Sequence, residues 1–394
     1  MNDDWVPMSL NEVAEVLDSQ RRPINSDERA KRPGPVPYYG ANGQAGWIDE
    51  ALFDEPLVLL GEDAIDFGNP SARKAYVISG PSWVNNHAHV LRARRDVVLT
   101  DFLCHTLNHV DYTDFVAFGT RSKLTQSKMK QISVDIPPLP VQRRIVDLMA
   151  HLDNHLANLQ TERDAAQRLL VALRDEQLEP GADWQVMRLL EVTTKVGSGA
   201  TPRGGESSYV SSGISLIRSQ NVYDYHFEWE GLARISDAQA QLLDGVTVRD
   251  HDVLINITGA SVNRCCIVPS EALPARVNQH VAILRPDPDT VSSDFLLNSL
   301  RQSRVKAELD RMAGSGTTRQ ALTKSQLENV KISVPPVEDQ ASLVAPIQAL
   351  HSVWEGCGQE AERLTLFRAS LLSSLLSGRS SIPDAYDSLL PEVA

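Results

Sequence analysis

"LTQSKMKQISVDIPPLPVQ" occupies residues 124–142, and "LTKSQLENVKISVPPVEDQ" occupies residues 322–340. The two stretches align without a gap at a spacing of 198 residues and share the leading Leu-Thr, a Ser, the Pro-Pro pair and the final Gln. Each passes from an alternating apolar segment into two prolines. Because proline disfavours helix just before itself and is tolerated in a first helical turn, each stretch predicts a strand, a stop and then a helix.

The similarity between the two halves extends well beyond this stretch. Three further pairs of segments match, and all four occur in the same order along the chain. Their spacings differ, so insertions lie between them, and a repeat of this length is domain-sized. The chain is therefore a tandem duplication. The three pairs are "WVPMSLNEV" at 5–13 with "WQVMRLLEV" at 184–192, "PLVLLGED" at 56–63 with "HDVLINIT" at 251–258, and "VNNHAHVLR" at 84–92 with "VNQHVAILR" at 277–285.

A long amphipathic helix is predicted after each Pro-Pro pair, because apolar residues recur at steps of three and four as in coiled coils. Arg163 interrupts the first apolar stripe, and Gly356 and Gly358 lie within the second helix, where they predict a kink or weak turn. We expect the two helices to pack on each other. Their apolar positions are Ile145, Leu148, Leu152, Leu156, Leu159, Ala166, Leu170 and Leu173 in the first, and Leu343, Ile347, Leu350, Trp354, Cys357, Ala361, Leu364 and Leu371 in the second.

The predicted fold class is α+β, with two α/β domains in tandem pseudo-symmetric repeat, separated by two long antiparallel coiled-coil helices. Short strands and Gly/Ser/Asn turns dominate each globular part. The predicted boundaries are 1–137 for the first domain, 138–180 for the first helix, 181–335 for the second domain, 336–379 for the second helix and 380–394 for a tail.

Composition and charge narrow the function classes. The formal net charge of −13 argues against a strong nucleic-acid binder acting alone, because such affinity comes mainly from neutralising phosphates. Charge is uneven, however: residues 82–131 carry seven basic against four acidic side chains, and residues 301–324 carry six against two. No apolar run is long enough for a membrane span and no signal peptide is evident, so a cytoplasmic protein is expected.

The sequence contains no recognisable catalytic motif. The phosphate-loop pattern, the G-x-S-x-G elbow and the H-E-x-x-H zinc motif are all missing. His87 and His89, with His105 and His109 nearby, have a spacing that a metal could use, but only His87 has a counterpart in the second half, at His280. A metal-dependent enzyme using His87 and His89 is thus an alternative, and the main prediction is a chain with no catalytic residues and no metal.

Four segments of the second half carry a family resemblance: "GSGATPRGG" at 197–205, "ISLIRSQNV" at 214–222, "VNQHVAILR" at 277–285 and the run from Gly314 to Gln340. Together with the doubled unit, they resemble the specificity (S) subunits of Type I restriction-modification systems. The first half, with "PYYGANGQAGWID" at 37–49 and "WVNNHAHVLR" at 83–92, resembles another version of the recognition domain of that family. The first unit lacks the Gly-Ser-Gly-x-Thr-Pro opening, and residues 19–34 differ in kind.

The resemblance implies two target recognition domains, each reading one half of a split sequence in double-stranded DNA, with the two helices as a spacer. It implies no catalytic role for this chain and no cofactor bound by it. Two methyltransferase subunits would bring S-adenosylmethionine, and two restriction-translocase subunits would bring ATP- and Mg²⁺-dependent machinery. A duplicated scaffold that binds no DNA is a further alternative.

Candidate DNA contacts are loop residues that can donate to base edges or phosphates. In the first half these are Tyr39, Asn42, Asn86, His87, Arg121 and Lys123. In the second half they are Ser198, Thr201, Arg203, Arg218, Gln220, Asn221, Arg264, Thr317, Thr318 and Arg319. Candidate partner contacts are exposed helix residues, namely Arg144, Asn154 and Arg168.

Overall fold

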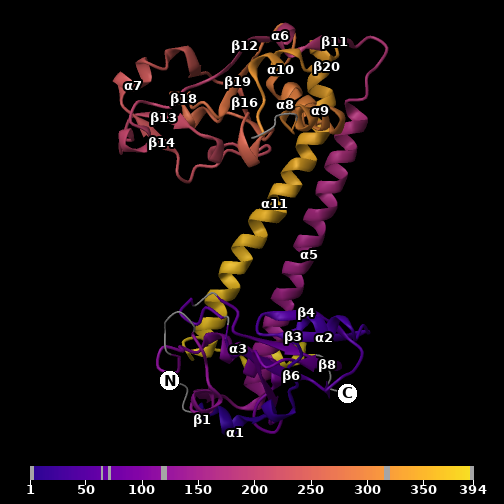
Figure 1. Cartoon of the computed structure of the whole chain (residues 1–394), viewed down its shortest axis with the longest axis vertical. Helices are drawn as coiled ribbons and strands as arrows, with labels where there is room; N and C mark the ends of the chain where they lie inside the picture. Colours follow the sequence, from indigo (N-terminus) through magenta and orange to yellow (C-terminus); the bar gives the residue numbers. More distant parts are fainter. Residues whose placement is uncertain (1–3, 64, 70–71, 117–121, 315–319, 391–394) are drawn as a thin grey trace. The chain divides into compact units, whose positions relative to one another are not determined.

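The computed structural model describes residues 4–63, 65–69, 72–116, 122–314 and 320–390 of the 394-residue chain. The chain forms two compact units, with unit 1 made of residues 1–159 and 359–394 and unit 2 of residues 160–358. Two long helices, α5 (Leu139–Gln177) and α11 (Val337–Leu376), each contribute residues to both units (Figure 1).

Short strands and helices build the globular part of each unit. Those of unit 1 are β1 (Val6–Ser9), α1 (Leu10–Val13), β2 (Ala14–Val16), α2 (Ser26–Ala30), β3 (Val36–Gly40), β4 (Gly43–Ile48), β5 (Phe53–Asp54), β6 (Leu57–Gly61), β7 (Ala75–Ile78), β8 (Pro81–Val84), β9 (Ala88–Ala93), α3 (Thr100–His109), α4 (Gln126–Met129) and β10 (Ser133–Ile136). Those of unit 2 are β11 (Gln185–Arg188), α6 (Leu189–Val192), β12 (Thr193–Ser198), β13 (Ile214–Ile217), β14 (Ala233–Ile235), α7 (Asp237–Gln241), β15 (Thr247–Val248), β16 (Val253–Asn256), β17 (Cys265–Ile267), β18 (Ala275–Val277), β19 (Val281–Pro286), α8 (Ser293–Arg301), α9 (Ser303–Gly314), α10 (Lys324–Asn329) and β20 (Lys331–Val334).

The sheets of the two units have the same topology. Unit 1 contains the strand orders β1-β10, β2-β9-β6-β7 and β4-β3-β8-β5, and unit 2 contains β11-β20, β12-β19-β16-β17 and β14-β13-β18-β15. The parallel pair occurs at the same place in each, between β3 and β8 and between β13 and β18. The duplication found in the sequence is therefore a duplication of the whole sheet architecture.

Each unit has its central strand buried on both faces. In β6, Val58 and Leu60 join the core that contains α3, whereas Leu57 and Leu59 join the core between the two four-stranded sheets. Strand β16 divides its side chains in the same way, because successive residues of a strand point to opposite faces. In unit 2 the sheet of β13, β14 and β18 lies on the side of β16 and β19 away from α8 and α9 (Figure 1).

The repeated stretch forms the base of each long helix. Thr125 and Thr323 cap α4 and α10, and the following strands β10 and β20 pair antiparallel with β1 and β11. The final glutamine lies in the first turns of the long helix: Gln142 is fully buried, and its amide bonds the backbone of Val97, Leu99 and Pro137. Gln340 makes the same set of contacts in unit 2, to Thr290, Ser292 and Pro335.

Within each unit, α5 and α11 run antiparallel. In unit 1 Asp153 pairs with Arg368, and in unit 2 the guanidinium of Arg163 lies 4.7 Å from the ring centre of Trp354. A side-chain carbon on Gly358 would lie 3.0 Å from the Arg163 guanidinium carbon, so the glycine leaves room for this arginine. The sequence predicted a kink or weak turn at the glycines, but α11 remains helical through both of them. Among the described helices, none is long and apolar enough to cross a membrane.

Candidate nucleic-acid interface

Three chain segments meet at one edge of each central sheet, and we call this surface the three-loop edge. In unit 1 the segments are the end of β6 at Glu62 and Asp63, the turn at Asn86 and His87 before β9, and the segment at Lys123 before α4. The amide of Glu62 donates to the carbonyl of His87 at 2.9 Å, and the amide of Leu124 donates to the carbonyl of Glu62 at 2.9 Å.

Unit 2 joins the equivalent segments with the same hydrogen bonds. The amide of Ile257 donates to the carbonyl of His280 at 2.9 Å, and the amide of Leu322 donates to the carbonyl of Ile257 at 2.8 Å. The match places Asp63 in register with Thr258 and His87 in register with His280. The two units thus hold different side chains on one backbone framework.

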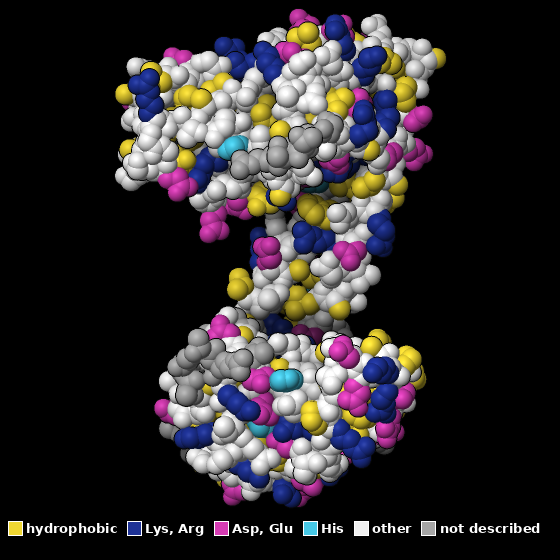
Figure 2. Space-filling model, in the orientation of Figure 1, with side chains coloured by type: hydrophobic (Ala, Val, Ile, Leu, Met, Phe, Trp, Pro, Cys, Tyr) yellow, Lys and Arg dark blue, Asp and Glu magenta, His cyan; other side chains and the backbone are white. Residues whose placement is uncertain are grey.

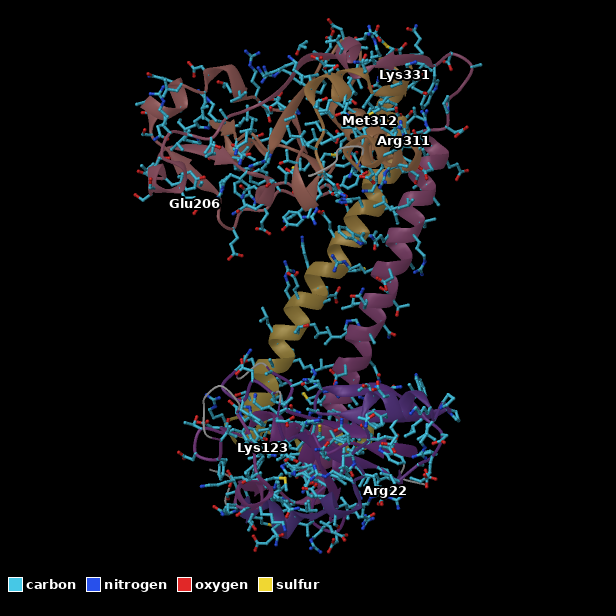
Figure 3. The ribbon with its side chains drawn as sticks, viewed as in Figure 1. Arg22, Lys123, Glu206, Arg311, Met312 and Lys331 are labelled. Atoms are coloured by element: carbon cyan, nitrogen blue, oxygen red, sulfur yellow. The ribbon has the colours of Figure 1, made fainter. Side chains whose placement is uncertain are left out.

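In unit 1 two of the predicted DNA-contacting residues of this edge, His87 and Lys123, are paired with acids. The Nδ1 of exposed His87 lies 2.9 Å from an oxygen of Asp63, and the ammonium of Lys123 lies 2.9 Å from Glu62. Glu62 also accepts from Arg21 at 2.9 Å. Figure 3 shows Lys123 at the surface of unit 1. These acids fix the positions of the histidine and the lysine, and they also lower the net positive charge of the edge.

A buried aspartate–histidine pair lies beneath this edge. Both ring nitrogens of His89 face oxygen atoms, with Nδ1 2.6 Å from Asp18 and Nε2 2.8 Å from the carbonyl of Leu124. Burial acts to raise the pKa of Asp18, but the hydrogen bond and charge of His89, the amide of Val90 and the charge of Arg21 outweigh it and lower that pKa. His89 therefore cross-links β9 to the segment before α4.

The described residues around His87 and His89 are not arranged as a metal site, which the alternative of a metal-dependent enzyme would require. His89 has both nitrogens occupied by protein oxygens, and His87 bonds a single carboxylate. Within the described ranges no group of three or more His, Cys, Asp or Glu side chains is arranged to hold a metal ion. The other two histidines considered for a metal, His105 and His109, lie on α3, where burial lowers the pKa of each imidazole.

In unit 2 a chain of hydrogen bonds fixes the protonation of His280. The hydroxyl of Thr201 donates to the Oε1 of Gln279, and the Nε2 of Gln279 donates to the Nε2 of His280 at 2.9 Å. That ring nitrogen is an acceptor, so the proton lies on Nδ1, which donates to the hydroxyl oxygen of Thr258. Gly199 permits the approach, since a side chain there would collide with the backbone of Val277.

An open cup of about 470 Å³ adjoins this chain of hydrogen bonds. Two predicted DNA-contacting residues line it: Gln220, which is exposed, and Arg264, whose guanidinium lies 4.7 Å from the ring centre of Tyr223. His280 and Thr258 form another part of the wall. A concave surface with an amide, a guanidinium, an imidazole and hydroxyls offers the donors and acceptors that read base edges.

Arg218 and Asn221 shape the loop beside the cup. Arg218 donates to the carbonyl of Gly231 at 2.7 Å and lies 3.5 Å from Glu206, so its charge is partly neutralised. Asn221 is fully buried, accepts from the amide of Arg218 at 3.0 Å and donates to the carbonyl of Glu228 at 2.9 Å. The structure gives Asn221 a role in holding the loop, and a direct DNA contact would require these bonds to open.

The remaining predicted DNA contacts fall into two groups. Asn42, Asn86, Ser198 and Arg203 are exposed, and Tyr39 is half-buried, with its ring centre 6.1 Å from that of Tyr76. Four others, Arg121, Thr317, Thr318 and Arg319, lie outside the described residues. Their proposed roles stay predictions.

The candidate partner contacts differ in exposure. Asn154 and Arg168 are exposed on α5, as expected. Arg144 was also expected to be exposed, but only 6% of it is, because its guanidinium is enclosed by the C-terminal segment and bonds Asp384 and Asp387. Its partners lie about 240 positions away in the sequence, so sequence spacing gave no sign of them.

Sequence reasoning did not single out Asp63, Thr258 or Gln279 as candidate site residues. A signal for the first two was available, because "PLVLLGED" and "HDVLINIT" align and end in Asp63 and Thr258. Gln279 lies in the aligned "VNQH" segment opposite Asn86. On the face shown in Figure 2, basic and acidic side chains are interspersed over both units, so neither unit presents a face of one charge there.

The fold and the two edges define a class: a duplicated α+β protein with one polar recognition surface per unit. The family described as Type I restriction modification DNA specificity domain matches residues 2–167 and again residues 181–352. This chain therefore belongs to the family of Type I specificity subunits, whose members are non-catalytic and recognise DNA targets.

Known proteins resemble this chain in sequence or in fold. The chain is 24% identical over 389 residues to a putative type I restriction enzyme specificity subunit, S.HindORF215P, of Haemophilus influenzae, covering 94% of this chain and 95% of that one. It is 20% identical over 312 residues to the putative MjaX specificity subunit of Methanocaldococcus jannaschii, covering 74% and 70%. The crystal structure of a Type I S subunit from M. genitalium covers 95% of this chain and 97% of that one, with a TM-score of 0.61 at 13% identity.

Proposed function

We propose that this chain is the DNA-recognition subunit of a Type I restriction-modification complex and reads a bipartite, interrupted sequence. One observation carries the proposal: the two units present the same three-loop edge with different side chains. Asn86, His87 and Asp63 in unit 1 correspond to Gln279, His280 and Thr258 in unit 2. One framework with two sets of hydrogen-bonding groups suits two different half-sites.

We further propose that the chain scaffolds its partners and leaves the chemistry to them. A net charge of −13 and the acids paired with Arg21 and Lys123 leave little surplus positive charge for DNA phosphates. DNA affinity would then depend on the two methyltransferase subunits, which would also supply S-adenosylmethionine. Two restriction-translocase subunits would supply ATP and Mg²⁺ chemistry. Exposed positions such as Asn154 and Arg168 are candidate docking points for these partners.

The test is binding by the chain purified with its methyltransferase subunit. The complex should retard one interrupted sequence in preference to its scrambled form, and the affinity should fall steeply as salt rises. Mapping methylated adenines in the host genome should give one asymmetric, interrupted motif that disappears when the gene is deleted. Sequence-blind binding and an unchanged methylation pattern would instead favour a scaffold that does not read DNA.

A pair of matched variants tests the assignment of the cup to one half-site. Gln220→Ala removes an exposed amide from the cup and should relax specificity in one half-site, at a cost of about 1–3 kcal/mol for a lost base contact. Gln241→Ala removes an exposed amide at the end of α7 and should change neither half-site. If Gln220→Ala altered both half-sites, or neither, the assignment of the cup would be wrong.

A further inference from the structure

A second cavity lies within unit 2, at the place where α5 and α11 meet α8 and α9, and we call it the helix-junction cavity. Its volume is about 290 Å³. Its lining includes three basic residues, Arg174, Arg301 and Lys306, and three aromatic residues, Tyr225, His351 and Trp354. It shares no lining residue with the cup of the three-loop edge.

The cavity wall carries more positive than negative charge. Arg174 is only 5% exposed; its guanidinium donates to the carbonyl of Arg301 at 3.0 Å and lies 5.2 Å from the ring centre of Tyr225. Asp224, the acid of the cavity wall, forms its ion pair with Arg301. Within the described ranges no carboxylate pairs with Arg174. A buried charge without a counter-charge is unfavourable, so an anion at this place would stabilise the unit.

Buried nitrogen atoms of the same residues also lack partners. The Nε of Arg174, the Nε of Arg301 and the Nε2 of His351 have no hydrogen-bond acceptor or donor among the described residues. Burial lowers the pKa of His351, and the charge of Arg174 lowers it further against the opposing carboxylate of Glu355. Three residues of the cavity wall thus each keep one nitrogen without a partner, although both guanidiniums bond through their other nitrogens. Residual hydrogen-bonding capacity beside a cavity is a feature of ligand sites.

Unit 1 provides an internal comparison, because the repeat aligns Asp153 on α5 with His351 on α11. In unit 1 Asp153 accepts hydrogen bonds from two nitrogens of a guanidinium that reaches across from the other helix, from the Nε of Arg368 at 2.5 Å and from one of its terminal nitrogens at 2.7 Å. Unit 2 also has a guanidinium from the other helix, Arg174, which lies one helical turn beyond Leu170, the position aligned with Arg368; the position aligned with Asp153 holds a histidine. Among the described residues, no carboxylate bonds Arg174 as Asp153 bonds Arg368.

We propose that the helix-junction cavity binds a small molecule that carries a carboxylate or phosphate on a planar ring. The guanidinium of Arg174 and the ammonium of Lys306 would bind the oxyanion, as such groups do with charge-assisted hydrogen bonds. The rings of Tyr225 and Trp354 would stack on the planar part. Binding would stabilise the packing of α5 and α11 in unit 2, and it requires neither DNA nor a partner subunit.

The experiment uses the full-length chain and three probes: adenosine monophosphate, benzoate and inorganic phosphate, each at fixed ionic strength against chloride. Thermal unfolding and titration calorimetry measure the response. Adenosine monophosphate or benzoate should raise the unfolding temperature and bind saturably, and inorganic phosphate should bind more weakly. If phosphate bound as tightly as the ring-bearing probes, the planar part of the proposal would be overturned. If no probe acted beyond chloride, the whole proposal would be overturned.

Variants locate the response in the cavity. Arg174→Leu introduces the residue that the repeat holds at the aligned position, Leu372, and should abolish probe binding. Lys306→Ala changes an exposed residue, so the fold is retained, and should weaken binding about tenfold, as loss of one charge-assisted hydrogen bond does. Arg311→Leu removes an exposed charge from the same helix, α9, and should change nothing (Figure 3).

His351→Asp is the sharpest test. It copies the carboxylate of Asp153 into unit 2, so it should raise the unfolding temperature of the unliganded chain and abolish the effect of the probes. A chain that kept its full probe response with this substitution would contradict the proposal. Equal loss of binding in Arg311→Leu and Arg174→Leu would also contradict it, since the response would then reflect overall charge alone.

Discussion

At the scale of single residues, the shared glutamine explains much of the repeated sequence. Gln142 and Gln340 each bond three backbone groups: one within the strand-to-helix turn and two in the segment that leads into α3 or α8. One amide therefore connects the start of a long helix to the globular part of each unit. No apolar residue of similar size can make these bonds, which accounts for a glutamine in both copies.

Gln142→Leu should destabilise unit 1 strongly, because it leaves the amide of Leu99 and the carbonyls of Val97 and Pro137 without their partner. Each buried backbone group left unpaired costs about 1–3 kcal/mol. Urea denaturation should show a lower midpoint with little change in slope. Gln131→Leu, at an exposed position, is the matched control and should stay close to the parent. An unchanged midpoint for Gln142→Leu would show that the amide does not hold this junction.

The Asp18–His89 pair gives a prediction about acid. The pKa of Asp18 is lowered in the folded chain, so its ionised form stabilises the fold above the unfolded pKa of about 3.9, and this contribution is lost as pH falls through the folded value. Between neutral pH and about pH 2, Asp18→Asn should therefore lose less unfolding free energy than the parent. Asp27→Asn, on exposed α2, should follow the parent curve. Parallel curves for Asp18→Asn and the parent would contradict this role.

The sequence pattern predicted the burial of apolar side chains better than the burial of polar ones. The apolar residues of the repeated stretch, including Leu124, Met129, Ile132 and Val134, are buried as their alternation indicates. Asn221 and Arg144 behaved differently, since their burial depends on partners supplied by other segments. A polar side chain is buried only where such partners exist, and the sequence does not show which segments will meet.

At the scale of elements, the two apolar stripes predicted the long helices well. Ile145, Leu159 and Leu170 on α5, and Ile347 on α11, are buried, and the other residues of both stripes are at least partly so. Arg163 fits the first stripe because Gly358 and Trp354 accommodate it from α11. The two glycines therefore differ: Gly358 leaves room for Arg163, whereas the position of Gly356 has open space around it. The expectation of a turn in the helix did not distinguish them.

Gly356→Ala should stabilise unit 2 by about 0.5–1 kcal/mol, because alanine is the better helix former and a side-chain carbon there meets no atom within 4 Å. Gly358→Ala should gain less or lose stability, since its new carbon would displace the Arg163 guanidinium from Trp354. Chemical denaturation of the two variants side by side measures the difference. A larger gain from Gly358→Ala would show that Arg163 contributes nothing by its position.

At the scale of the whole molecule, duplication separates what must be shared from what can differ. The two units share strand orders and the backbone bonds of the three-loop edge, and they differ in the side chains displayed there. The sequence revealed the repeat and the helices because those depend on periodic apolar patterns. It did not reveal how the loops meet, since sheet order and side-chain pairing arise from contacts between distant segments.

The proposed spacer role of α5 and α11 leads to a prediction about the DNA target. Seven residues that continue the apolar stripe, inserted after Leu159 in α5 and after Gly358 in α11, keep the heptad register and lengthen each helix by about 10 Å. At about 3.4 Å per base pair, the unread gap should grow by about three base pairs while both half-sites stay the same. Methylated adenines mapped in cells that express the variant with its partners measure this gap. Seven residues inserted at 181–183, before β11, serve as the control and should leave the gap unchanged. A changed half-site, or a gap that ignores helix length, would show that the two helices do not set the spacing.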